Sequence, residues 1–568
     1  MDLLIHPHKS HRKEGALTGF KKVSKHASTH RLALGTFLIA LLILGFLAWS
    51  VPVWADGGQP DPRYVNPRDK LIKNFTVDHS KFDILKQDFK TAPEVTKACL
   101  SCHTEAGNQL MHRIHWTWEF QNPKTGQLLG KKHVLNNFCI AITSNWPRCT
   151  SCHAGYGWKD ANFDFSKQEN MDCLACHDTT GQYRKFPTAA GHPTYEPKEF
   201  PPGSGKIWEP PDLSYIAQHV GMTSRQTCGR CHFYGGGGDG VKHGDLDSSL
   251  FNPPREVDVH MSPDGLNFQC STCHTNRAHD LAGSRYAPTA VDPYGQDMPV
   301  MQHQRATCES CHGTAPHKGS VMASKLNDHV DKVACQTCHI PEFARGGKPT
   351  KVWWDWSKAG KFTPDGKKIA TEEYNTLKGE FRWEKNVVPE YAWFNGTIRY
   401  TLATDKIDPS KVVPINRIEG SYDDGRIYPF KVMRGKQPYD AGNNTLVIPH
   451  LFGNDDTAYW KNFDWGKAIE AGMKTAGLPY SGKYGFVETK MYWLIDHMVA
   501  PKEQALKCED CHSRNGRLAK LTGFYMPGRD RLKIIDILGW LGVALTLVGV
   551  MLHGGLRVIT SAKKGAKR

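Results

Sequence analysis

Residues 149–177 read CTSCHAGYGWKDANFDFSKQENMDCLACH, with the pattern Cys-x-x-Cys-His at both ends. The same pattern occurs eight times in this chain of 568 residues. The copies, numbered motifs one to eight in chain order, are Cys99-Cys102-His103, Cys149-Cys152-His153, Cys173-Cys176-His177, Cys228-Cys231-His232, Cys270-Cys273-His274, Cys308-Cys311-His312, Cys335-Cys338-His339 and Cys508-Cys511-His512. This repeat is the main organising feature of the sequence.

Each copy has the spacing of a c-type haem attachment site, in which two cysteines bond the porphyrin and the adjacent histidine ligates the iron. A zinc site or a disulfide pair that happens to precede a histidine is the alternative for a single copy. Zinc spacing does not require that histidine, so it does not explain eight copies. The sequence therefore predicts eight c-type haems, held by the sixteen motif cysteines, with the eight motif histidines as iron ligands.

Composition and periodicity bear on the fold class. Only 39% of the residues are hydrophobic, and the chain has 53 Gly and 34 Pro. Alternation of period two is scarce and helical patterns are short. We expect a mainly α fold with much irregular structure: a multihaem cytochrome c wrapped around a stack of eight haems, with one transmembrane helix at each end. The aromatic-rich, motif-free stretch 340–507 is expected to pack over the haems and to offer His450 and His497 as further ligands.

Two runs are long and apolar enough to cross a membrane. Leu32 to Ala55 carries no charge, and Ile534 to Leu552 carries only Asp536. Basic residues flank the first run on its N-terminal side and the second on its C-terminal side, so the positive-inside rule places both tails in the cytoplasm. The expected domains are a basic cytoplasmic tail (1–31), an N-terminal transmembrane anchor or signal segment (32–55), an exported octahaem domain (56–530), a transmembrane helix (533–553) and a basic cytoplasmic tail (554–568).

The location expected from this topology is the bacterial inner membrane, with the haem domain facing the periplasm. Whether the first run is cleaved after Ala55 or retained stays open, because small residues near the cut favour cleavage whereas the long run and basic leader favour an anchor. The net charge of +15 lies largely in the tails, where a membrane explains it. No groove-reading helix or base-stacking platform is evident, so we predict no nucleic-acid partner.

Two further features fall outside the repeat. Cys139 is the seventeenth cysteine and has no partner outside the motifs, so it is either a buried filler or a reactive thiol. After motif four, residues 233–245 read FYGGGGDGVKHGD, with five glycines in six positions. Such a run lets the backbone approach a flat cofactor closely, and a plain flexible turn is the alternative.

These strings give the chain a family resemblance. The run Asn136-Asn137-Phe138-Cys139 before CTSCHAGYGW, together with CGRCHFYGGGGDGVKHGD, resembles the octahaem tetrathionate reductase family, over roughly residues 95 to 515. The resemblance implies that the second haem is catalytic, with Lys242 as an unusual iron ligand and with Asn136, Cys139 and Asp239 around the pocket. The two membrane runs depart from the soluble form typical of that family, which leaves the electron donor and the substrate open.

The leading functional expectation is a multihaem reductase of a small oxyanion. Tetrathionate is the substrate that the resemblance implies, and nitrite or hydroxylamine is the next alternative. A non-catalytic electron conduit between the quinol pool and periplasmic acceptors is the alternative from another class. Fourteen non-motif histidines lie in the exported part, more than the seven that seven bis-histidine haems need, so their number does not choose between enzyme and conduit. Without a quinone site or a b-haem histidine pair in either run, a membrane quinol-oxidising cytochrome b-type subunit is the expected partner.

Overall fold

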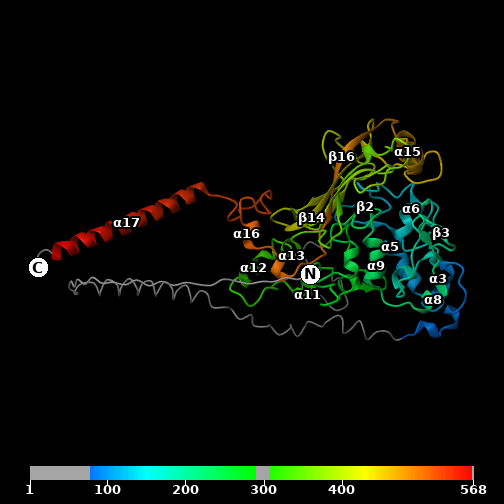
Figure 1. Cartoon of the computed structure of the whole chain (residues 1–568), viewed down its shortest axis with the longest axis horizontal. Coiled ribbons are helices and arrows are strands. Elements are labelled where there is room, and N and C mark those ends of the chain that lie inside the picture. The colour runs from blue at the N-terminus through cyan, green and yellow to red at the C-terminus, as the bar shows by residue number, and fades with distance from the viewer. Residues whose placement is uncertain (1–76, 289–305, 566–568) are drawn as a thin grey trace, which may run out of the picture. The chain divides into compact units, whose positions relative to one another are not determined.

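The computed structural model describes residues 77–288 and 306–565, so the predicted tail 1–31 and segment 32–55 lie outside the described residues. The chain up to residue 345 consists of short helices joined by long loops (Figure 1). The helices there are α3 (Ala92–Leu100), α4 (Ala106–Met111), α5 (Ile114–Thr117), α6 (Trp146–Cys149), α7 (Leu174–His177), α8 (Leu213–Gln218), α9 (Arg225–His232), α10 (Cys270–Cys273), α11 (Glu309–His312), α12 (Ala323–His329) and α13 (Cys335–His339). Short hairpins add β1 (Phe120–Gln121), β2 (Leu128–Leu129), β3 (Lys198–Glu199), β4 (Ile207–Trp208), β5 (Asn276–Arg277) and β6 (Asp280–Leu281).

Most motifs close a helical turn on themselves. The N–H of His103 donates to the Cys99 carbonyl oxygen at 2.9 Å, and that of His177 to Cys173 at 3.0 Å. In these turns the second cysteine and the adjacent histidine lie at or just after the end of a short helix. Many of the short helices in this part of the chain therefore form at the motifs.

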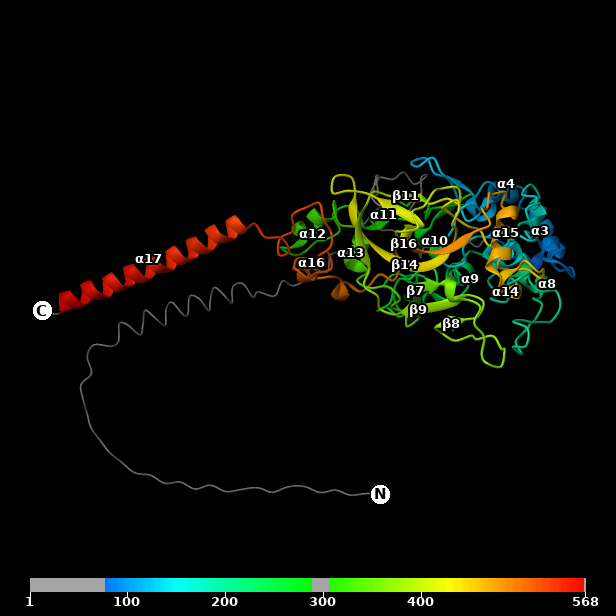
Figure 2. The ribbon, with the colours of Figure 1, turned by 90° about the horizontal axis from the view of Figure 1, so that it is seen from above.

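The later part of the chain forms an eight-stranded sheet that the sequence analysis does not predict. Neighbouring strands in the sheet follow the order β12-β16-β14-β7-β9-β8. Strands β10 and β15 also pair with β14. The strands are β7 (Thr350–Asp355), β8 (Tyr374–Asn375), β9 (Gly379–Glu384), β10 (Glu390–Phe394), β12 (Val413–Pro414), β14 (Arg426–Asp440), β15 (Thr445–Leu446) and β16 (Tyr484–Leu494). A separate pair, β11 (Thr397–Tyr400) and β13 (Asn416–Glu419), and the helices α14 (Tyr459–Asn462), α15 (Trp465–Thr475) and α16 (Cys508–Cys511) complete this part (Figure 2).

The long strand β14 shows why the alternation of polar and apolar residues does not predict the sheet. Its residues are buried almost throughout, from Arg426 to Met433 without a break, because both faces of the strand are covered. It pairs antiparallel with β16 from Phe430–Leu494 to Asp440–Tyr484, and parallel with β7 at Arg434–Trp353. A strand buried on both faces has no polar face, so it shows no period of two. The expectation of a mainly helical chain is thus incomplete.

Three of the tryptophans in this region pack within the sheet. Trp354 and Trp356 are fully buried and stack at 5.0 Å, and Trp465 meets Trp356 edge-on at 6.1 Å. They build the core of the sheet itself, together with α15. His450 is one of the two histidines expected as haem ligands. Both of its ring nitrogens are hydrogen-bonded, one to the Ser144 carbonyl oxygen and the other to the Asp455 carboxylate.

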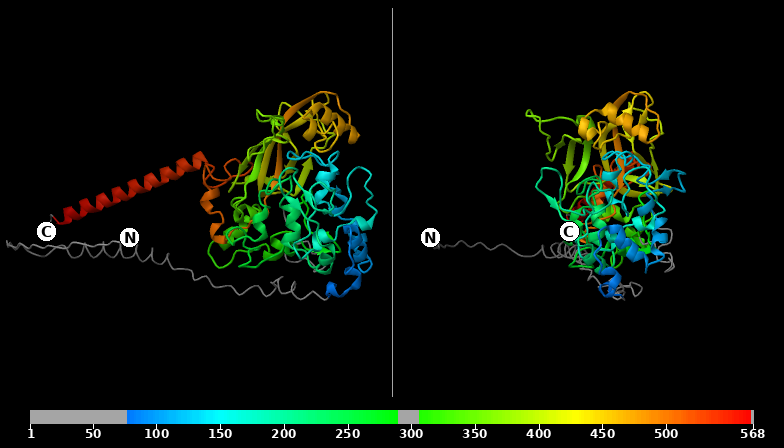
Figure 3. Two further views of the ribbon diagram at one scale, coloured as in Figure 1. Left: turned by 45° about the vertical axis from the view of Figure 1, so that its right-hand side comes forward. Right: turned by 90° about the vertical axis from the view of Figure 1, so that its right-hand side faces the viewer.

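The sheet lies against the helical part of the chain (Figure 3). Ala334, at the start of α13, donates its N–H to the Ile427 carbonyl oxygen at 3.0 Å. The Asn137 side chain donates to the Met433 carbonyl oxygen at 2.8 Å. These contacts bring β14 beside the segments that carry Cys139 and the glycine-rich loop.

The chain ends in α17 (Lys533–Gly565), which covers the predicted span 533–553 and continues into the predicted tail. Its length and composition suffice to cross a membrane, and its apolar side chains are exposed along its whole length. It is the one such helix among the residues that the structure describes.

Candidate functional site

Seven motif histidines each face one histidine from outside the motifs. The ring centroids of these seven pairs lie 6.0 to 6.5 Å apart. Two imidazoles on opposite sides of one metal ion have this separation, because each metal–nitrogen bond is about 2 Å long. The pairs are His103 with His79, His177 with His279, His232 with His115, His274 with His497, His312 with His260, His339 with His317 and His512 with His329.

Hydrogen bonds orient many of these rings so that one nitrogen stays free. The Nδ1–H of His177 donates to the Gly221 carbonyl oxygen at 2.8 Å, and that of His512 to the Pro527 carbonyl oxygen at 2.9 Å. The Nδ1–H of His497 donates to Asp245 at 3.0 Å. Such bonds fix the tautomer in which Nε2 can bind a metal. The paired rings and their orientation therefore fit an iron between the two imidazoles of each pair.

His153, of motif two, is the exception. Its backbone N–H donates to Thr150 at 2.8 Å instead of to Cys149, and the residue is extended, with φ −69° and ψ 145°. The ring is fully buried, and its Nε2–H donates to the Trp116 carbonyl oxygen at 2.6 Å. Among the described residues, no histidine ring faces it. Its ring neighbours are aromatic: Trp116, Trp118, Trp158, Phe163 and Phe165.

His153 stays a predicted iron ligand, and its surroundings differ from those of the other seven motif histidines. The nitrogen that the other motif histidines keep free is already engaged, and burial lowers the pKa of His153 to about 3, so the ring is neutral. Its Nδ1 is buried without a partner among the described residues. The extended backbone at His153 turns the ring into an aromatic cage, which a sequence that keeps the full motif does not reveal.

Lys242 lies beside motif two. Its amine is close enough to the Cys152 thiol to interact electrostatically, and it lies 5.2 Å above the ring of Trp493. Burial, with repulsion from Arg285 and Lys131, holds the pKa of Lys242 well below its usual value. This shift favours the neutral amine, which is the form that binds a metal.

The loop that carries Lys242 is held in place by the sheet. The side-chain nitrogen of Lys431, on β14, is fully buried and donates to the carbonyl oxygens of Val241 and Lys242 and to Thr350 Oγ1, at 2.9, 3.1 and 2.5 Å. Thr350 in turn donates to the Gly240 carbonyl oxygen at 2.6 Å. Lys431 and Thr350 lie far from Lys242 in the sequence and carry no motif, so the sequence analysis missed both.

Cys139 comes from another part of the chain and meets the same loop. Its Sγ donates to the Gly236 carbonyl oxygen at 3.3 Å, across 97 residues of sequence. The thiol is also near Cys149, the first cysteine of motif two. The structure thus places Cys139 and Lys242 next to the two attachment cysteines of one motif.

Asn136 and Asp239 have their polar atoms engaged by the protein. Asn136 Oδ1 accepts the N–H of Phe138 and of Cys139, at 3.0 and 2.7 Å, so it shapes the turn that carries the thiol. The carboxylate of Asp239 accepts the backbone N–H and the hydroxyl of Ser248, at 2.8 and 2.5 Å. Both residues hold backbone near the pocket, and no hydrogen bond joins either side chain to Lys242 within the described part of the chain.

Two lysines that the sequence analysis missed lie near Cys139. A Cβ added to Gly237, where φ is +88°, would lie 3.7 Å from Lys378 Nζ and 3.9 Å from Cys139 Sγ, so these two groups flank the same bare stretch of loop. The Lys351 amine lies 3.8 Å from the ring centre of Trp354 and has no hydrogen bond or ion pair to a described residue. Burial and repulsion from Lys378 lower its pKa to about 6, and Cys139 opposes the shift.

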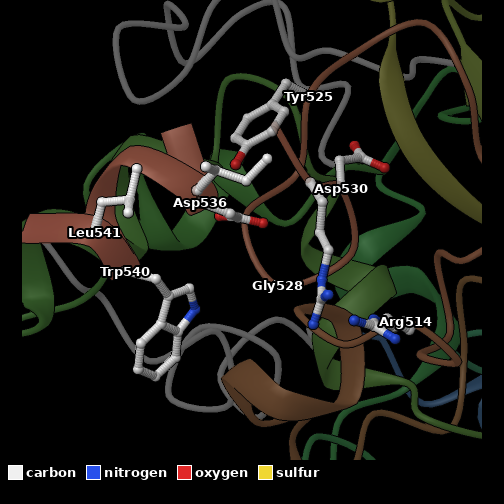
Figure 4. Close-up of a pocket in the computed structure, with 9 residues that line it drawn as sticks. Arg514, Tyr525, Gly528, Asp530, Asp536, Trp540 and Leu541 are labelled. Carbon is white, nitrogen blue, oxygen red and sulfur yellow. The ribbon is translucent and has the colours of Figure 1, made fainter. Parts of the chain in front are cut away.

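A second hollow lies near motif eight. It is formed by the loop after α16 and the first turns of α17, and Gly528 packs there against the backbone of His512 (Figure 4). Charged side chains face aromatic and aliphatic ones across it. Its lining residues are Arg514, Tyr525, Gly528, Asp530, Arg531, Asp536, Ile537, Trp540 and Leu541.

Comparisons with known proteins also indicate a cytochrome c, as the paired histidines do. Residues 351–515 match a family described as bacterial cytochrome c. The crystal structure of octahaem cytochrome c from Shewanella oneidensis is similar, with a TM-score of 0.67 and 45% identity, over 78% of this chain and 95% of that one. An uncharacterised protein of Archaeoglobus fulgidus is 23% identical over 266 residues, which are 40% of this chain and 88% of that protein.

Proposed function

Because this chain belongs to the octahaem cytochromes c, we propose that it is a membrane-anchored, periplasmic reductase of a small sulfur or nitrogen oxyanion. Tetrathionate is the favoured substrate, and nitrite or hydroxylamine is next. The observation that carries the proposal is the contrast between seven paired motif histidines and the unpaired His153. A conduit needs eight closed irons, whereas an enzyme needs one that substrate can reach.

The proposed reactive centre is the haem of motif two, attached through Cys149 and Cys152. Lys242 and His153 would both hold its iron, and the lysine amine would be the ligand that yields to substrate. The position of the Lys242 amine near Cys152, and the burial that lowers its pKa, support this assignment. Seven haems with two histidines each would supply electrons, which is the chemistry that the cofactors bring to the protein.

The surroundings of Cys139 favour an anionic sulfur substrate. Lys378 and Lys351 offer positive charge beside the thiol when protonated, and Arg285 lies 4.6 Å above the same Trp493 ring as Lys242. Cations attract oxyanions, and a deprotonated thiol attacks S–S bonds. The pocket thus combines a site for sulfonate charge with a nucleophile for the central bond of tetrathionate.

The covalent step balances as follows. The Cys139 thiolate attacks one central sulfur of tetrathionate, the S–S bond breaks, and one thiosulfate leaves with the electron pair. Two electrons from the protein then cleave the bond between Cys139 and the remaining fragment, which releases the second thiosulfate and restores the thiolate. Nitrite and hydroxylamine have no S–S bond, so their reduction would not use this step.

The haem domain is proposed to be held at the bacterial inner membrane by α17. Motif eight ends at His512, 21 residues before Lys533, where α17 begins. The hollow between that motif and the helix offers a surface at which a membrane quinol-oxidising cytochrome b-type subunit could dock. Electrons would then reach the protein through motif eight.

An acceptor screen tests the reductase proposal. The purified protein is fully reduced, freed of reductant and mixed under argon with tetrathionate, nitrite, hydroxylamine or sulfite. We expect tetrathionate to reoxidise the haems fastest and to yield two thiosulfates for each pair of electrons withdrawn. If none of the four compounds reoxidises the haems, while an oxidised soluble cytochrome does, the protein is a conduit.

A further inference from the structure

His497, which faces His274 of motif five, differs from the other paired histidines in the acceptor of its Nδ1–H. That group donates to a carboxylate oxygen, Asp245 Oδ2, at 3.0 Å. Six other paired histidines donate from Nδ1 to a neutral oxygen, a backbone carbonyl or a side-chain amide, at 2.6 to 3.1 Å. Among the paired rings of the described residues, only His497 is hydrogen-bonded to a carboxylate. The six are His177, His274, His279, His317, His329 and His512.

The Asp245 side chain is buried and faces the segment that carries His497. Only 1% of it is exposed. Its Oδ2 accepts three N–H groups: the backbone N–H of Asp496 at 2.8 Å, the backbone N–H of His497 at 3.0 Å and the His497 ring N–H. The other oxygen, Oδ1, is buried and has no hydrogen-bonding partner among the described residues. The hydrogen bonds of the carboxylate therefore all go to the ligand and to the backbone that holds it.

Little nearby positive charge offsets Asp245. Within the described part of the chain, no lysine or arginine forms an ion pair with it, and its one such partner is the His497 ring. Lys431 is close enough to interact electrostatically, but its amine donates its hydrogen bonds to Val241, Lys242 and Thr350. A charge in the protein interior acts more strongly on its neighbours than the same charge in water. The Asp245 charge therefore acts on the His497 ring at full strength.

A carboxylate at Nδ1–H changes how strongly the opposite ring nitrogen binds a metal. It draws the shared proton towards itself, gives the ring part of the character of an imidazolate, and makes Nε2 a more basic ligand. A more basic ligand stabilises ferric iron more than ferrous iron, so the reduction potential falls. A neutral carbonyl acceptor has the same effect to a smaller degree, because charge-assisted hydrogen bonds are the stronger ones.

We propose that Asp245 is a positioning residue that fixes the His497 ring and lowers the reduction potential of the haem of motif five. The lowered potential makes this haem pass its electron on instead of holding it. The effect is specific to motif five, because the other paired rings have no carboxylate acceptor among the described residues. The inference rests on a haem held by His274 and His497, and neither on the identity of the oxyanion nor on the ligands of motif two.

Asp245 also ends the glycine-rich loop that carries Lys242, three residues earlier. One short loop therefore brings an amine to motif two and a carboxylate to the partner ligand of motif five. A substitution that loosened this loop would disturb both haems. The test must therefore remove the charge of Asp245 and keep its hydrogen bonds. Asp245→Asn does so, because the amide has the same shape and retains an acceptor oxygen.

A potentiometric titration of the full-length protein in detergent, followed by EPR of the individual haems, tests the effect of the charge. His497→Met first identifies the motif-five signal, as the bis-histidine signal that this substitution removes. The Asp245→Asn variant is then poised at the wild-type midpoint potential of that haem. The ratio of reduced to oxidised motif-five haem should rise at least fivefold, and the other haems should change far less. An unchanged ratio would overturn the proposal.

Asp258→Asn is the matched control. Asp258 is also buried, and its Oδ2 accepts the backbone N–H of Met498 and of Val499, at 3.0 and 3.2 Å, directly after His497 in the chain. Among the described residues, no imidazole nitrogen donates to it. The control thus removes one negative charge from the same segment and leaves the ligand hydrogen bond in place. It should shift the motif-five potential much less than Asp245→Asn does. Equal shifts would show that the charge of the interior, and not the bond to His497, sets the potential.

Near-infrared magnetic circular dichroism of the ferric protein reads the ligand directly. In the wild type, the charge-transfer band of one bis-histidine haem should be displaced towards that of an imidazolate complex, and Asp245→Asn should return it to the position of the others. Bands that coincide in the wild type would contradict the proposal without any substitution. A new high-spin signal in Asp245→Asn, at a haem content unchanged by pyridine haemochrome, would show that Asp245 only holds the ring in place.

Discussion

The side-chain nitrogen of Lys431 donates a 3.1 Å hydrogen bond to the carbonyl oxygen of Lys242. A lysine in the core of the sheet thereby positions the residue that we propose as the iron ligand of motif two. Among the described residues, the Lys431 amine hydrogen-bonds only to backbone carbonyl oxygens and a hydroxyl, so its role is to hold the loop and not to meet the substrate.

Replacing Lys431 should therefore disturb Lys242 specifically. Lys431→Met removes the donor from the buried Val241 carbonyl, at a cost of roughly 1–3 kcal/mol, and from the partly buried Lys242 carbonyl. We expect turnover to fall at least tenfold and one haem to change its spectrum, while the other seven titrate as before. Lys436→Met, on the same strand, is the control and should behave as wild type. An unchanged haem spectrum in Lys431→Met would contradict the positioning role.

The covalent role of Cys139 predicts a difference between substrate classes. Cys139→Ser should reduce the rate with tetrathionate far more than the rates with nitrite or hydroxylamine, because only tetrathionate offers an S–S bond to a thiolate. Steady-state rates with each acceptor, measured with the same electron donor, check this. Equal losses for both classes would leave Cys139 as a residue that only shapes the pocket.

The Lys351 amine should lower the stability of the fold and, when protonated, help to bind the anionic substrate. Its buried amine has no hydrogen-bonding partner among the described residues, so Lys351→Met should raise the free energy of unfolding by about 1–3 kcal/mol. Below about pH 6, where the folded protein carries a charged Lys351, the same substitution should also raise the KM for tetrathionate. The pKa of Lys351 is lowered to about 6, so between that pH and its unfolded pKa the unfolded chain binds a proton that the folded chain does not.

The stability of the wild type therefore rises with pH through this window, and the gain from Lys351→Met should shrink from about pH 7 to about pH 9.5. Guanidinium unfolding followed by circular dichroism at both pH values measures it. A gain that is the same at both would show that the Lys351 amine is charged in the folded protein.

Topology can be checked independently of the haems. A reporter fused after Arg568 should be active only if it is one that works in the cytoplasm, because basic residues follow the apolar part of α17. Activity of a periplasmic reporter at this position would contradict the proposed orientation.

The sequence predicts c-type haem, which the comparisons support, because covalent attachment demands a fixed spacing of cysteines and histidine. The family resemblance also predicts that Cys139 and Lys242 share one pocket. The structure places both residues beside motif two. The partner histidines could not be assigned, since each pair joins residues that only the fold brings face to face, such as His274 and His497.

Two features could not be predicted for physical reasons. Strand β14 is buried on both faces, so the alternation that marks a half-buried strand is missing. His153 has an extended backbone and, among the described residues, no facing histidine, whereas its motif is identical in type to the other seven. Lys351, Lys378 and Lys431 are ordinary lysines in sequence and become notable only through burial.

The most direct test of the account is the ligation of the irons in the oxidised wild-type protein. Low-temperature EPR combined with near-infrared magnetic circular dichroism distinguishes bis-histidine haems from a haem with an amine ligand. We predict seven bis-histidine haems and one exception, whose signal alone is altered in Lys242→Ala. Eight bis-histidine signals, or an exception that Lys242→Ala leaves unchanged, would contradict the assignment of motif two as the reactive site.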